Sequence, residues 1–447
     1  MLERFRRGDI RTLVSARVLN EGLDVPDADI LAIGAVLFAQ RQRRAGLSLS
    51  EVLPPASNSG LWDTMPAVPS ERSRRRRGRI RVLTCCSIAE DDMPSVGAED
   101  LTAFVIALYE AAGTPPDHAQ IVATHQVGAN LVGHDSHGVV LLPTYIDRIG
   151  RGHIVPVARP EILNESPTTL AVNGRWGFGP VISEWTMERL VAKARETRIA
   201  AGTIREQSHV GRLADYPLMA TRAGFIGLMM ADSGQSAKAV APFGGREARL
   251  GTNPLCIAFP SDLPGPVFID MATSAVAAGK LNLARAQAKA IPLGWLLDKD
   301  GKPTTNPNAQ LEGGVMLPLG GPEGHKGYGL SFAVETLAAV LPGLGFGVDP
   351  KGRHNDGTFM LVVDPRAFSP TDFKVQVEAF VRYLKATPPA DGFDEVFYPG
   401  EIEYRTEQRR RREGIPIEDT TWRRLGEVAG RFGISPPRTI ISSTAHG

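Results

Sequence analysis

Length and charge already narrow the classes of protein to which this chain can belong. It has 447 residues, of which 43% are hydrophobic, enough for two or three domains with cores of their own. Lys and Arg total 50 against 49 Asp and Glu, a balance that argues against a dedicated nucleic-acid binder or a membrane-surface protein. No apolar run reaches membrane-spanning length, and the 3 cysteines, two of them adjacent, suit neither a disulfide framework nor a zinc site. We expect a cytoplasmic protein in a reducing compartment, with no metal site and no membrane contact.

The first 92 residues differ in composition from the rest and are predicted to be a poorly ordered N-terminal extension. Residues 53–72 are rich in Pro, Ser and Asn, and residues 72–79 form an arginine-rich run whose self-repulsion disfavours packing. Residues 1–33 resemble a fragment of the second motor lobe of superfamily-two helicases, through Phe5–Gly8 and Val18–Pro26. No Gly-x-x-x-x-Gly-Lys-Ser/Thr loop accompanies them to hold a nucleoside triphosphate. The extension supports one alternative function, nucleic-acid binding, which the even charge of the whole chain disfavours.

From residue 93 onward the hydrophobic pattern predicts helices and strands in alternation. Apolar residues recur at helical spacing from Leu101 to Ala112, after acidic residues and before a glycine, and residues 114–117 open a second helix. Short β-branched stretches predict strands at residues 169–172, 225–230, 255–259, 267–270 and 358–363. Helical stretches lie between some of them, at residues 184–194 and 330–341. This order predicts an α/β protein with flanking helices.

The usual signatures of catalysis are missing from this chain. It has no Gly-x-Gly-x-x-Gly loop for a dinucleotide, no Gly-x-Ser-x-Gly elbow and no His-Glu-x-x-His zinc helix. Polar clusters flanked by glycine remain, and the first is Gly133–Gly138. Its His137 stands beside Ser136 and a glycine, where an imidazole suits proton transfer near neutral pH. A histidine that caps a helix end is the alternative, and a metal site made of such close neighbours is disfavoured.

Further clusters carry polar residues that suit a bound anion or a proton transfer. His209 follows an apolar stretch that ends near Ile204, so we expect it to leave a strand end, where the sites of α/β proteins form. Asp270 also ends a predicted strand, and small hydroxyl residues follow it. Gly251–Pro254 forms another cluster, and Lys326 lies in a glycine-rich loop ahead of an apolar helix, where it can bind phosphate. A plain turn is the alternative for each.

Taken in order, these clusters resemble the signatures of one family. The matching stretches are Asp135–Val139, Ser208–Gly211, Gly251–Pro254, Asp270–Thr273, Pro303–Pro307, Lys326–Gly329 and Tyr398–Glu401. They resemble the second type of malate/L-lactate dehydrogenase, from about residue 97 to about residue 436. The resemblance implies an NAD- or NADP-dependent oxidoreductase that works as a homodimer and acts on a 2-oxo or 2-hydroxy carboxylic acid.

The resemblance also implies how the domains are arranged. It predicts a dinucleotide-binding sheet unrelated to the Rossmann fold, in an α/β domain of residues 169–374. Residues 93–168 and 375–447, from the two ends of the family region, are expected to form a flanking helical domain. Such a sheet accounts for the missing glycine fingerprint.

Candidate site residues come from the same resemblance. It implies that His137 and His209 face the nicotinamide and the substrate, with Ser136 beside them and Asp270 holding a ring in its working tautomer. The residues implied to contact the cofactor are His137, Ser233, Asp270, Met271, Ala272, Thr273, Lys326, Gly327, Gly400 and Glu401. As a hydride adds to the carbonyl carbon of a 2-oxo acid, a histidine gives a proton to the developing alkoxide. We favour His137 for that proton and keep His209 as its rival or relay.

One position departs from the family pattern. Many members carry an arginine three positions after the glycine of Ser-His-Gly, where it can bind the substrate carboxylate, but this chain has Leu141. The substrate anion still needs a charge-assisted partner. We therefore predict Arg212 for this role, with Arg249 as the second candidate.

Overall fold

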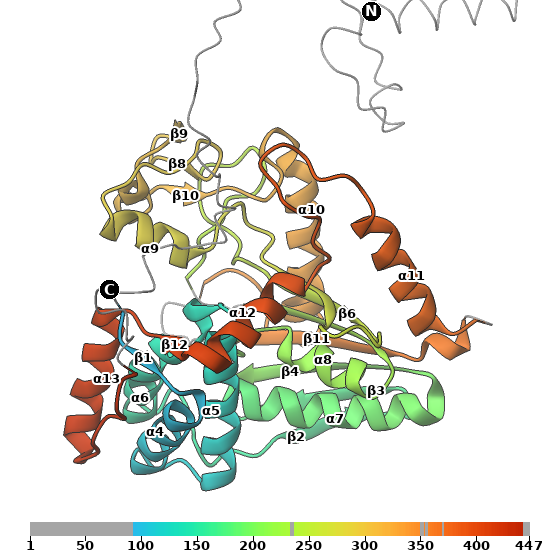
Figure 1. The fold of residues 1–447 in the computed structure, drawn as a ribbon, viewed down its shortest axis with the longest axis horizontal. Helices are drawn as coiled ribbons and strands as arrows, with labels where there is room; N and C mark the ends of the chain where they lie inside the picture. Colours follow the sequence, from blue (N-terminus) through green and yellow to red (C-terminus); the bar gives the residue numbers. More distant parts are fainter. Residues whose placement is uncertain (1–92, 233–236, 349–352, 354–355, 369–370, 441–447) are drawn as a thin grey trace, which may run out of the picture. The chain divides into compact units, whose positions relative to one another are not determined.

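A computed structural model describes residues 93–440, apart from residues 233–236, 349–352, 354–355 and 369–370 (Figure 1). The predicted N-terminal extension, with its helicase-like segment and its arginine run, lies outside the described residues, and so does Ser233. Within the described part, no helix is both long and apolar enough to cross a bilayer.

A seven-stranded mixed sheet forms the centre of the α/β fold (Figure 1). Its strands, in spatial order, are β2 (Glu161–Glu165), β3 (Thr169–Asn173), β4 (Ile199–Gln207), β11 (Asp356–Val363), β5 (Ile226–Asp232), β6 (Leu255–Phe259) and β7 (Val267–Met271). Strands β3 and β4 pair in parallel, and the other neighbours in this sheet are antiparallel. The strands predicted from β-branched stretches are confirmed as β3, β5, β6, β7 and β11.

Helices cover both faces of this sheet. Successive residues of a strand point to opposite faces, so Met229 packs with α7 (Gly179–Thr197) and α8 (Asp215–Arg222), while Met230 faces the other side. There α10 (Gly324–Glu335) continues into the π-helical turn η7 (Thr336–Val340). The helices predicted at residues 184–194 and 330–341 are confirmed by α7, α10 and η7.

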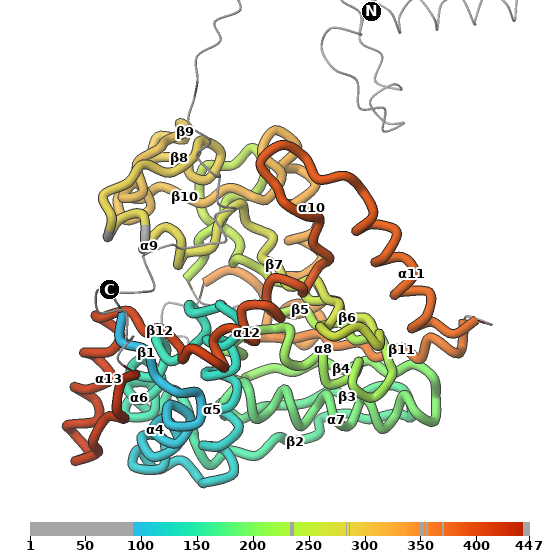
Figure 2. The backbone as a smooth tube through the Cα atoms, viewed as in Figure 1, coloured from blue at the N-terminus to red at the C-terminus, as the bar shows by residue number. Residues whose placement is uncertain are grey.

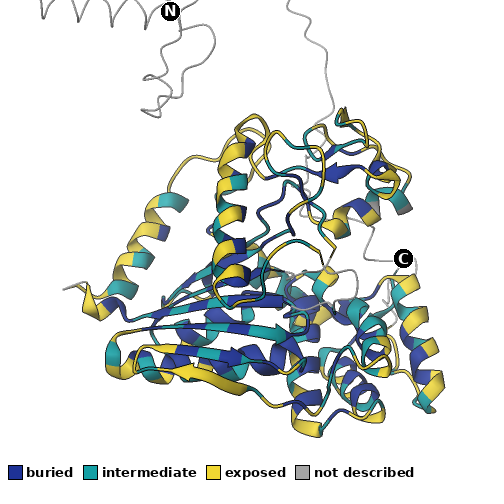
Figure 3. Cartoon of the chain, turned by 180° about the vertical axis from the view of Figure 1, so that it is seen from behind, coloured by how far each residue is buried: buried dark blue, intermediate teal, exposed yellow. Residues whose placement is uncertain are grey.

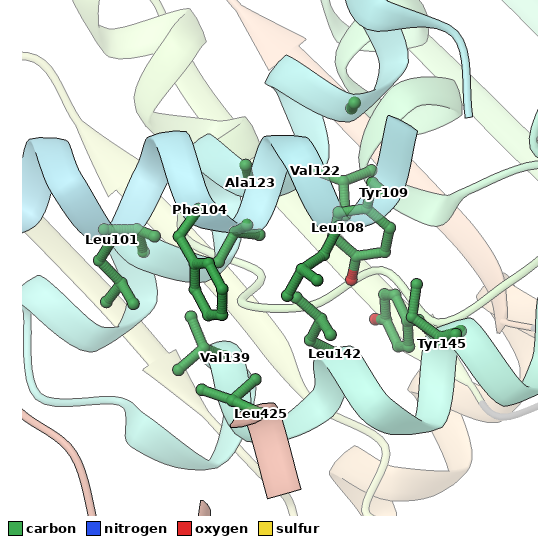
Figure 4. Close-up of a cluster of buried hydrophobic side chains, with 14 of the residues drawn as sticks. Leu101, Phe104, Leu108, Tyr109, Val122, Ala123, Val139, Leu142, Tyr145 and Leu425 are labelled. Atoms are coloured by element: carbon green, nitrogen blue, oxygen red, sulfur yellow. The ribbon is translucent and has the colours of Figure 1, made fainter. Parts of the chain in front are cut away.

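A helical layer stands beside the sheet and has a core of its own (Figure 4). Its elements are α4 (Ala98–Ala111), α5 (Pro116–Leu131), the 3-10 turns η3 (Asp135–His137) and η4 (Val139–Leu141), α6 (Leu142–Gly150), α12 (Glu401–Glu413) and α13 (Asp419–Phe432). Phe104 and Leu108 of α4 pack against Val139 and Leu142, which follow the His137 loop. The short strand β1 (Ser95–Val96) pairs with β12 (Ile415–Pro416), which joins the two ends of the family region. Both helices predicted after residue 93 are confirmed.

Residues between β7 and α10 form a small lobe that the sequence did not predict. It contains α9 (Ala278–Ala286), the 3-10 turns η5 (Pro307–Glu312) and η6 (Gly321–Glu323), and a sheet of β8 (Leu296–Leu297), β9 (Pro303–Thr304) and β10 (Val315–Met316). Leu281, Leu296 and Met316 share its core with Val240. Strands of two residues carry no alternating pattern, which explains why sequence periodicity did not reveal them.

Two elements close to the predicted boundaries at residues 169 and 375 pack with the large sheet. Strand β2 already belongs to the large sheet, and its five residues are all exposed, so it lacks the hydrophobic alternation of a half-buried strand. Helix α11 (Phe373–Lys385) follows the 3-10 turn η8 (Pro365–Ala367) and packs against the sheet edge, where Val381 meets Val267 of β7 and Tyr398. An amphipathic pattern predicts a helix but not the layer on which it packs.

A buried ion network fastens the helical layer to the sheet side. The imidazole of His125 on α5 lies 3.1 Å from a carboxylate oxygen of Asp215 and 3.0 Å from one of Glu184. Its ring stacks on Tyr216, with centroids 5.2 Å apart. Burial alone would lower the pKa of His125, but the hydrogen bonds and charges of Asp215 and Glu184 reverse this and raise the pKa to about 9. His125 is therefore an imidazolium at neutral pH.

This network makes stability depend on pH. Because the pKa of His125 rises from 6.5 to about 9 on folding, its contribution is complete below pH 6.5 and is lost as pH rises to about 9. We expect the free energy of unfolding to fall by on the order of 3 kcal/mol across that window in the wild type, relative to His125→Gln. Urea unfolding followed by Trp fluorescence measures the free energy of unfolding of both proteins at each pH. The difference between the two proteins removes the contributions of the other titrating groups, which they share. His153→Gln is the matched control and should behave as the wild type. If the free energy of unfolding depended on pH in the same way in the wild type and in His125→Gln, the raised pKa of His125 would be contradicted.

Candidate active site

His137 lies in a tight loop between α5 and α6. Asp135, Ser136 and His137 form the 3-10 turn η3, and the Ser136 hydroxyl lies 3.1 Å from Nδ1 of His137. Gly138 follows, and a Cβ there would overlap the side-chain amide of Asn130. The loop thus turns where only glycine fits and presents the serine and the imidazole together.

His209 approaches His137 from the sheet. As predicted, it leaves a strand end, two residues after β4. The two imidazole rings stack with centroids 5.8 Å apart and an interplanar angle of 14°. The structure therefore brings together two histidines that lie 72 residues apart in the sequence (209 − 137).

Tyr145 orients the His209 ring, a role that the sequence did not predict. Its hydroxyl lies 2.8 Å from Nδ1 of His209, and the backbone N–H of Gly211 donates to the same nitrogen at 3.3 Å. An accepting Nδ1 leaves the proton of the neutral ring on Nε2. Tyr145 is fully buried on α6, where sequence periodicity marks it only as a core residue (Figure 4).

Burial keeps both imidazoles neutral. Desolvation, with smaller effects of His209 and His134, lowers the pKa of His137 to about 3. Desolvation also lowers the pKa of His209. A neutral imidazole can accept a proton, as a general base does.

Arg212 lies in the buried network beside this pair. Its Nη1 donates to Asp215 at 2.9 Å, and its guanidinium stands 5.4 Å from the ring centroid of Phe268. Its Nε is buried and has no hydrogen-bond partner among the described residues. Arg212 also contributes to lowering the pKa of His137, which places its charge near the ring.

Asp270 is the last residue but one of strand β7. Its carboxylate accepts the backbone N–H of Ala214 at 2.9 Å, and burial raises its pKa. Tyr145, and not Asp270, makes the hydrogen bond to Nδ1 of His209. The role predicted for Asp270, holding a ring in its working tautomer, stays a prediction.

Arg249 lies elsewhere, in the loop that leads to Leu250. Its side chain is 69% exposed and pairs with Glu247 at 2.6 Å. No contact in the described part of the chain joins it to either histidine.

The predicted cofactor residues at the end of β7 and on α10 both contact the backbone of Leu319. Met271 ends β7, Ala272 and Thr273 follow it, and the backbone carbonyl of Thr273 accepts the N–H of Leu319 at 2.9 Å. Leu319 in turn lies so close to Gly327 that a Cβ at residue 327 would overlap its carbonyl. Lys326 beside it is 71% exposed, at the first turn of α10.

Gly400 and Glu401 lie at the other end of the same strand. Gly400 has φ +98, and a Cβ there would overlap the ring of Phe268 and the carbonyl of Pro266. Glu401 is buried and binds Lys385 at 2.7 Å and Arg405 at 2.5 Å. Its carboxylate thus already has two cationic partners.

A second buried charge cluster stands where Asp232 ends β5. Lys238 lies 3.2 Å from Asp232 and 3.1 Å from Glu335, and Asn253 donates to Glu335 at 2.9 Å. Burial raises the pKa of Asp232 to about 7. The sequence analysis singled out Asn253 within a glycine-flanked motif. It did not find Lys238 and Glu335, because they lie far from Asn253 in the sequence and belong to no recognisable motif. The described residues contain no cluster of histidines, cysteines and acids able to hold a metal ion.

Comparison with known proteins places these features in one family. A family profile described as malate/L-lactate dehydrogenase matches residues 96–426. The helicase-like resemblance of residues 1–33 is not borne out, because it lies outside this match and outside the described residues. Hydroxycarboxylate dehydrogenase B of Escherichia coli O157:H7 is 33% identical over 349 residues, which are 77% of this chain and 95% of that protein. L-sulfolactate dehydrogenase of Methanocaldococcus jannaschii is 36% identical over 74% of this chain and 95% of that protein.

Solved structures agree with the sequence comparison. Malate dehydrogenase from Pyrococcus horikoshii OT3 superposes with a TM-score of 0.70 at 33% identity, covering 77% of this chain and 97% of that one. Malate dehydrogenase from Entamoeba histolytica gives a TM-score of 0.73 at 30% identity over 77% of this chain and 99% of that one. From its sequence and its fold alike, the chain belongs to the malate/L-lactate dehydrogenase family.

Proposed function

We propose that this protein transfers a hydride between NAD or NADP and a 2-oxo or 2-hydroxy carboxylic acid. The observation that carries the proposal is the stacked pair of neutral histidines, 5.8 Å apart, from two motifs of the family. The named relatives act on malate, L-sulfolactate or hydroxycarboxylates, and these substrates share a hydroxyl group next to a carboxylate. Nothing observed favours the alternative of nucleic-acid binding.

Proton transfer is the chemistry that the chain's own residues supply. In the oxidation direction, neutral His137 accepts the proton of the substrate hydroxyl, and the Ser136 hydroxyl holds its Nδ1 at 3.1 Å. In the reverse direction the neutral ring takes up a proton from solvent and passes it to the alkoxide oxygen as that oxygen forms. The ring of His209, which Tyr145 orients, is either the alternative carrier of this proton or a relay for it. Arg212 binds the substrate carboxylate through donors that Asp215 does not occupy, with Arg249 as second candidate.

The residues near β7 and α10 fit a dinucleotide. A nicotinamide bound there would supply the hydride acceptor or donor of the reaction. Gly327 lets the first turn of α10 pack closely on the Leu319 backbone, and the N-terminus of that helix, with the exposed ammonium of Lys326, suits a phosphate group. The cofactor residues proposed from the family are His137, Ser233, Asp270, Met271, Ala272, Thr273, Lys326, Gly327, Gly400 and Glu401.

The same proposal includes a dinucleotide site on a sheet unlike the Rossmann fold. Rossmann sheets are parallel, and in the large sheet of this protein only β3 and β4 pair that way, which supports the proposal. A helical domain from the two ends of the family region is supported by the pairing of β1 with β12. A cytoplasmic location agrees with the buried free thiol of Cys256.

A homodimer is also part of the proposal. Monomeric proteins seldom leave large apolar side chains exposed along whole helices. Here α10 and η7 expose Phe332 and Val340, and α11 exposes Phe380 and Tyr383, the last to 74%. Figure 3 shows exposed residues along both helices. The only residue of α11 that is buried in the described chain is Val381. We propose that a second copy covers these helices.

Activity with purified full-length protein tests the function directly. We expect NADH or NADPH absorbance to fall with oxaloacetate, 2-oxoglutarate or phenylpyruvate. His137→Gln should lower kcat roughly 100- to 10,000-fold, because it removes the proton carrier. His153→Gln is the control and should match the wild type. Consumption of neither coenzyme with any acid, or full activity of His137→Gln, would refute the proposal.

Substrate-anion binding separates the two arginine candidates. We expect Arg212→Met to raise KM for the 2-oxo acid roughly 10- to 100-fold, since a charge-assisted hydrogen bond is lost. Arg249→Met should leave KM unchanged. The reverse pattern would assign the carboxylate to Arg249, and an unchanged KM in both variants would rule out both residues.

Sedimentation velocity tests the homodimer. We expect the wild type to sediment as a dimer and Phe380→Asp as a monomer, because a carboxylate cannot be buried there without a partner. Leu311, which is 72% exposed against 60% for Phe380, lies in the small lobe, and Leu311→Asp should stay dimeric. A monomeric wild type would contradict the proposed interface.

A further inference from the structure

Helix α12 presents one face to the loop that carries His137. Glu403, Thr406 and Arg410 are spaced three and four residues apart, so they share a face of the helix. Glu403 lies 3.6 Å from the imidazole of His134, and a Cβ at Gly133 would meet the Thr406 side chain at 3.2 Å. Each of the three residues thus meets the segment from residue 130 to residue 135.

Arg410 makes the strongest of these contacts. Its Nη1 donates to Asp135 Oδ1 at 2.8 Å and its Nη2 to Asp135 Oδ2 at 3.1 Å, a two-pronged pairing that fixes the orientation of the carboxylate. Nη1 also donates to the backbone carbonyl of Asn130. Arg410 is only 5% exposed, and Asp135 directly precedes Ser136 and His137.

Asn130 extends this contact across the whole loop. Its Nδ2 donates to Asp135 Oδ1 at 2.6 Å, and its Oδ1 accepts the backbone N–H of Val139 at 2.9 Å. One amide therefore holds the residues on both sides of Ser136, His137 and Gly138. The His137 loop is therefore fixed at both of its ends by the Asn130 amide. Arg410 in turn binds both Asp135 and the backbone carbonyl of Asn130.

The start of α12 is attached to the proposed cofactor side. The backbone N–H of Phe268 on β7 donates to the carbonyl of Pro399 at 3.1 Å, and Gly400 packs on the Phe268 ring. Figure 2 traces α12 from this segment to helix α5. A helix of 13 residues thus connects the strand that carries Asp270 with the loop that carries His137.

We propose that Arg410 is a positioning residue for the reaction: acting through Asp135 and Asn130, it holds Ser136 and His137 against His209. The inference rests on the proposed function, in which His137 moves the substrate proton. A role in stability alone accounts less well for the ion pair of Arg410 with Asp135. The Asp135 side chain is 49% exposed, and an ion pair with so exposed a partner adds little stability, while a buried guanidinium is costly to desolvate.

The first experiment measures kcat and KM of Arg410→Ala and of Arg410→Lys, which keeps the charge but loses the fork. We expect kcat to fall roughly 10- to 100-fold in both, as for a reacting group displaced by about 1 Å, with KM for the coenzyme unchanged. Millimolar guanidinium should restore much of the lost kcat in Arg410→Ala, whereas methylammonium should not. A general loss of stability would not show this selectivity. The side chain of Arg411 is exposed and pairs with Glu407, so Arg411→Ala is the matched control and should behave as the wild type.

A second variant covers the case in which Arg410→Ala does not fold. Asp135→Asn keeps the shape of the side chain and removes its charge, and we expect it to lower kcat to a similar degree. Its combination with Arg410→Lys should cost little more than either change alone. Wild-type kcat in folded Arg410→Lys or Asp135→Asn, or additive losses in the double variant, would overturn the inference. If His137→Gln also keeps full activity, the proposed function fails; if His137→Gln is inactive, only the role of Arg410 fails.

Discussion

The stacking of His137 on His209 is the contact on which the site depends, because its two members belong to different layers. His137 is held by the helical layer, and His209 leaves the central sheet. The 5.8 Å separation of the rings is therefore set by the packing between those layers, not by either motif alone. Two links cross the boundary close to the rings: the Tyr145 hydroxyl on Nδ1 of His209, and the His125 imidazolium between Asp215 and Glu184.

Much of the fold and part of the site were predictable from local sequence signals. Strands β3, β5, β6 and β7 coincide with short apolar runs, and α4 has apolar residues at helical spacing, so local sequence reveals them. His137 and His209 were recognisable because each stands in a glycine-flanked polar motif at the end of an apolar element, and the structure brings them together as expected. Their common motif order, not their spacing, identified the family.

What sequence did not reveal are residues whose importance arises only from long-range contacts. Tyr145 and His125 lie on helices among apolar neighbours, where a buried aromatic ring or a histidine reads as a core residue. Asp215 stands three residues after Arg212, but its ion pair with His125 spans 90 residues. The exposed edge strand β2 and the two-residue strands of the small lobe lack the alternation that marks a strand. Tertiary packing decided all of these features.

Position 141, where this chain has a leucine and the family pattern an arginine, lies in the helical layer. Leu141 packs against the core of the helical layer, next to the Val139 and Leu142 side chains. An arginine there would have to extend its charged end out of this apolar core. Arg212, by contrast, has Asp215 to compensate its charge, and Asp215 is itself shared with the His125 imidazolium. In the proposed function, the substrate anion is therefore bound from the sheet layer, where a charge-compensating network exists.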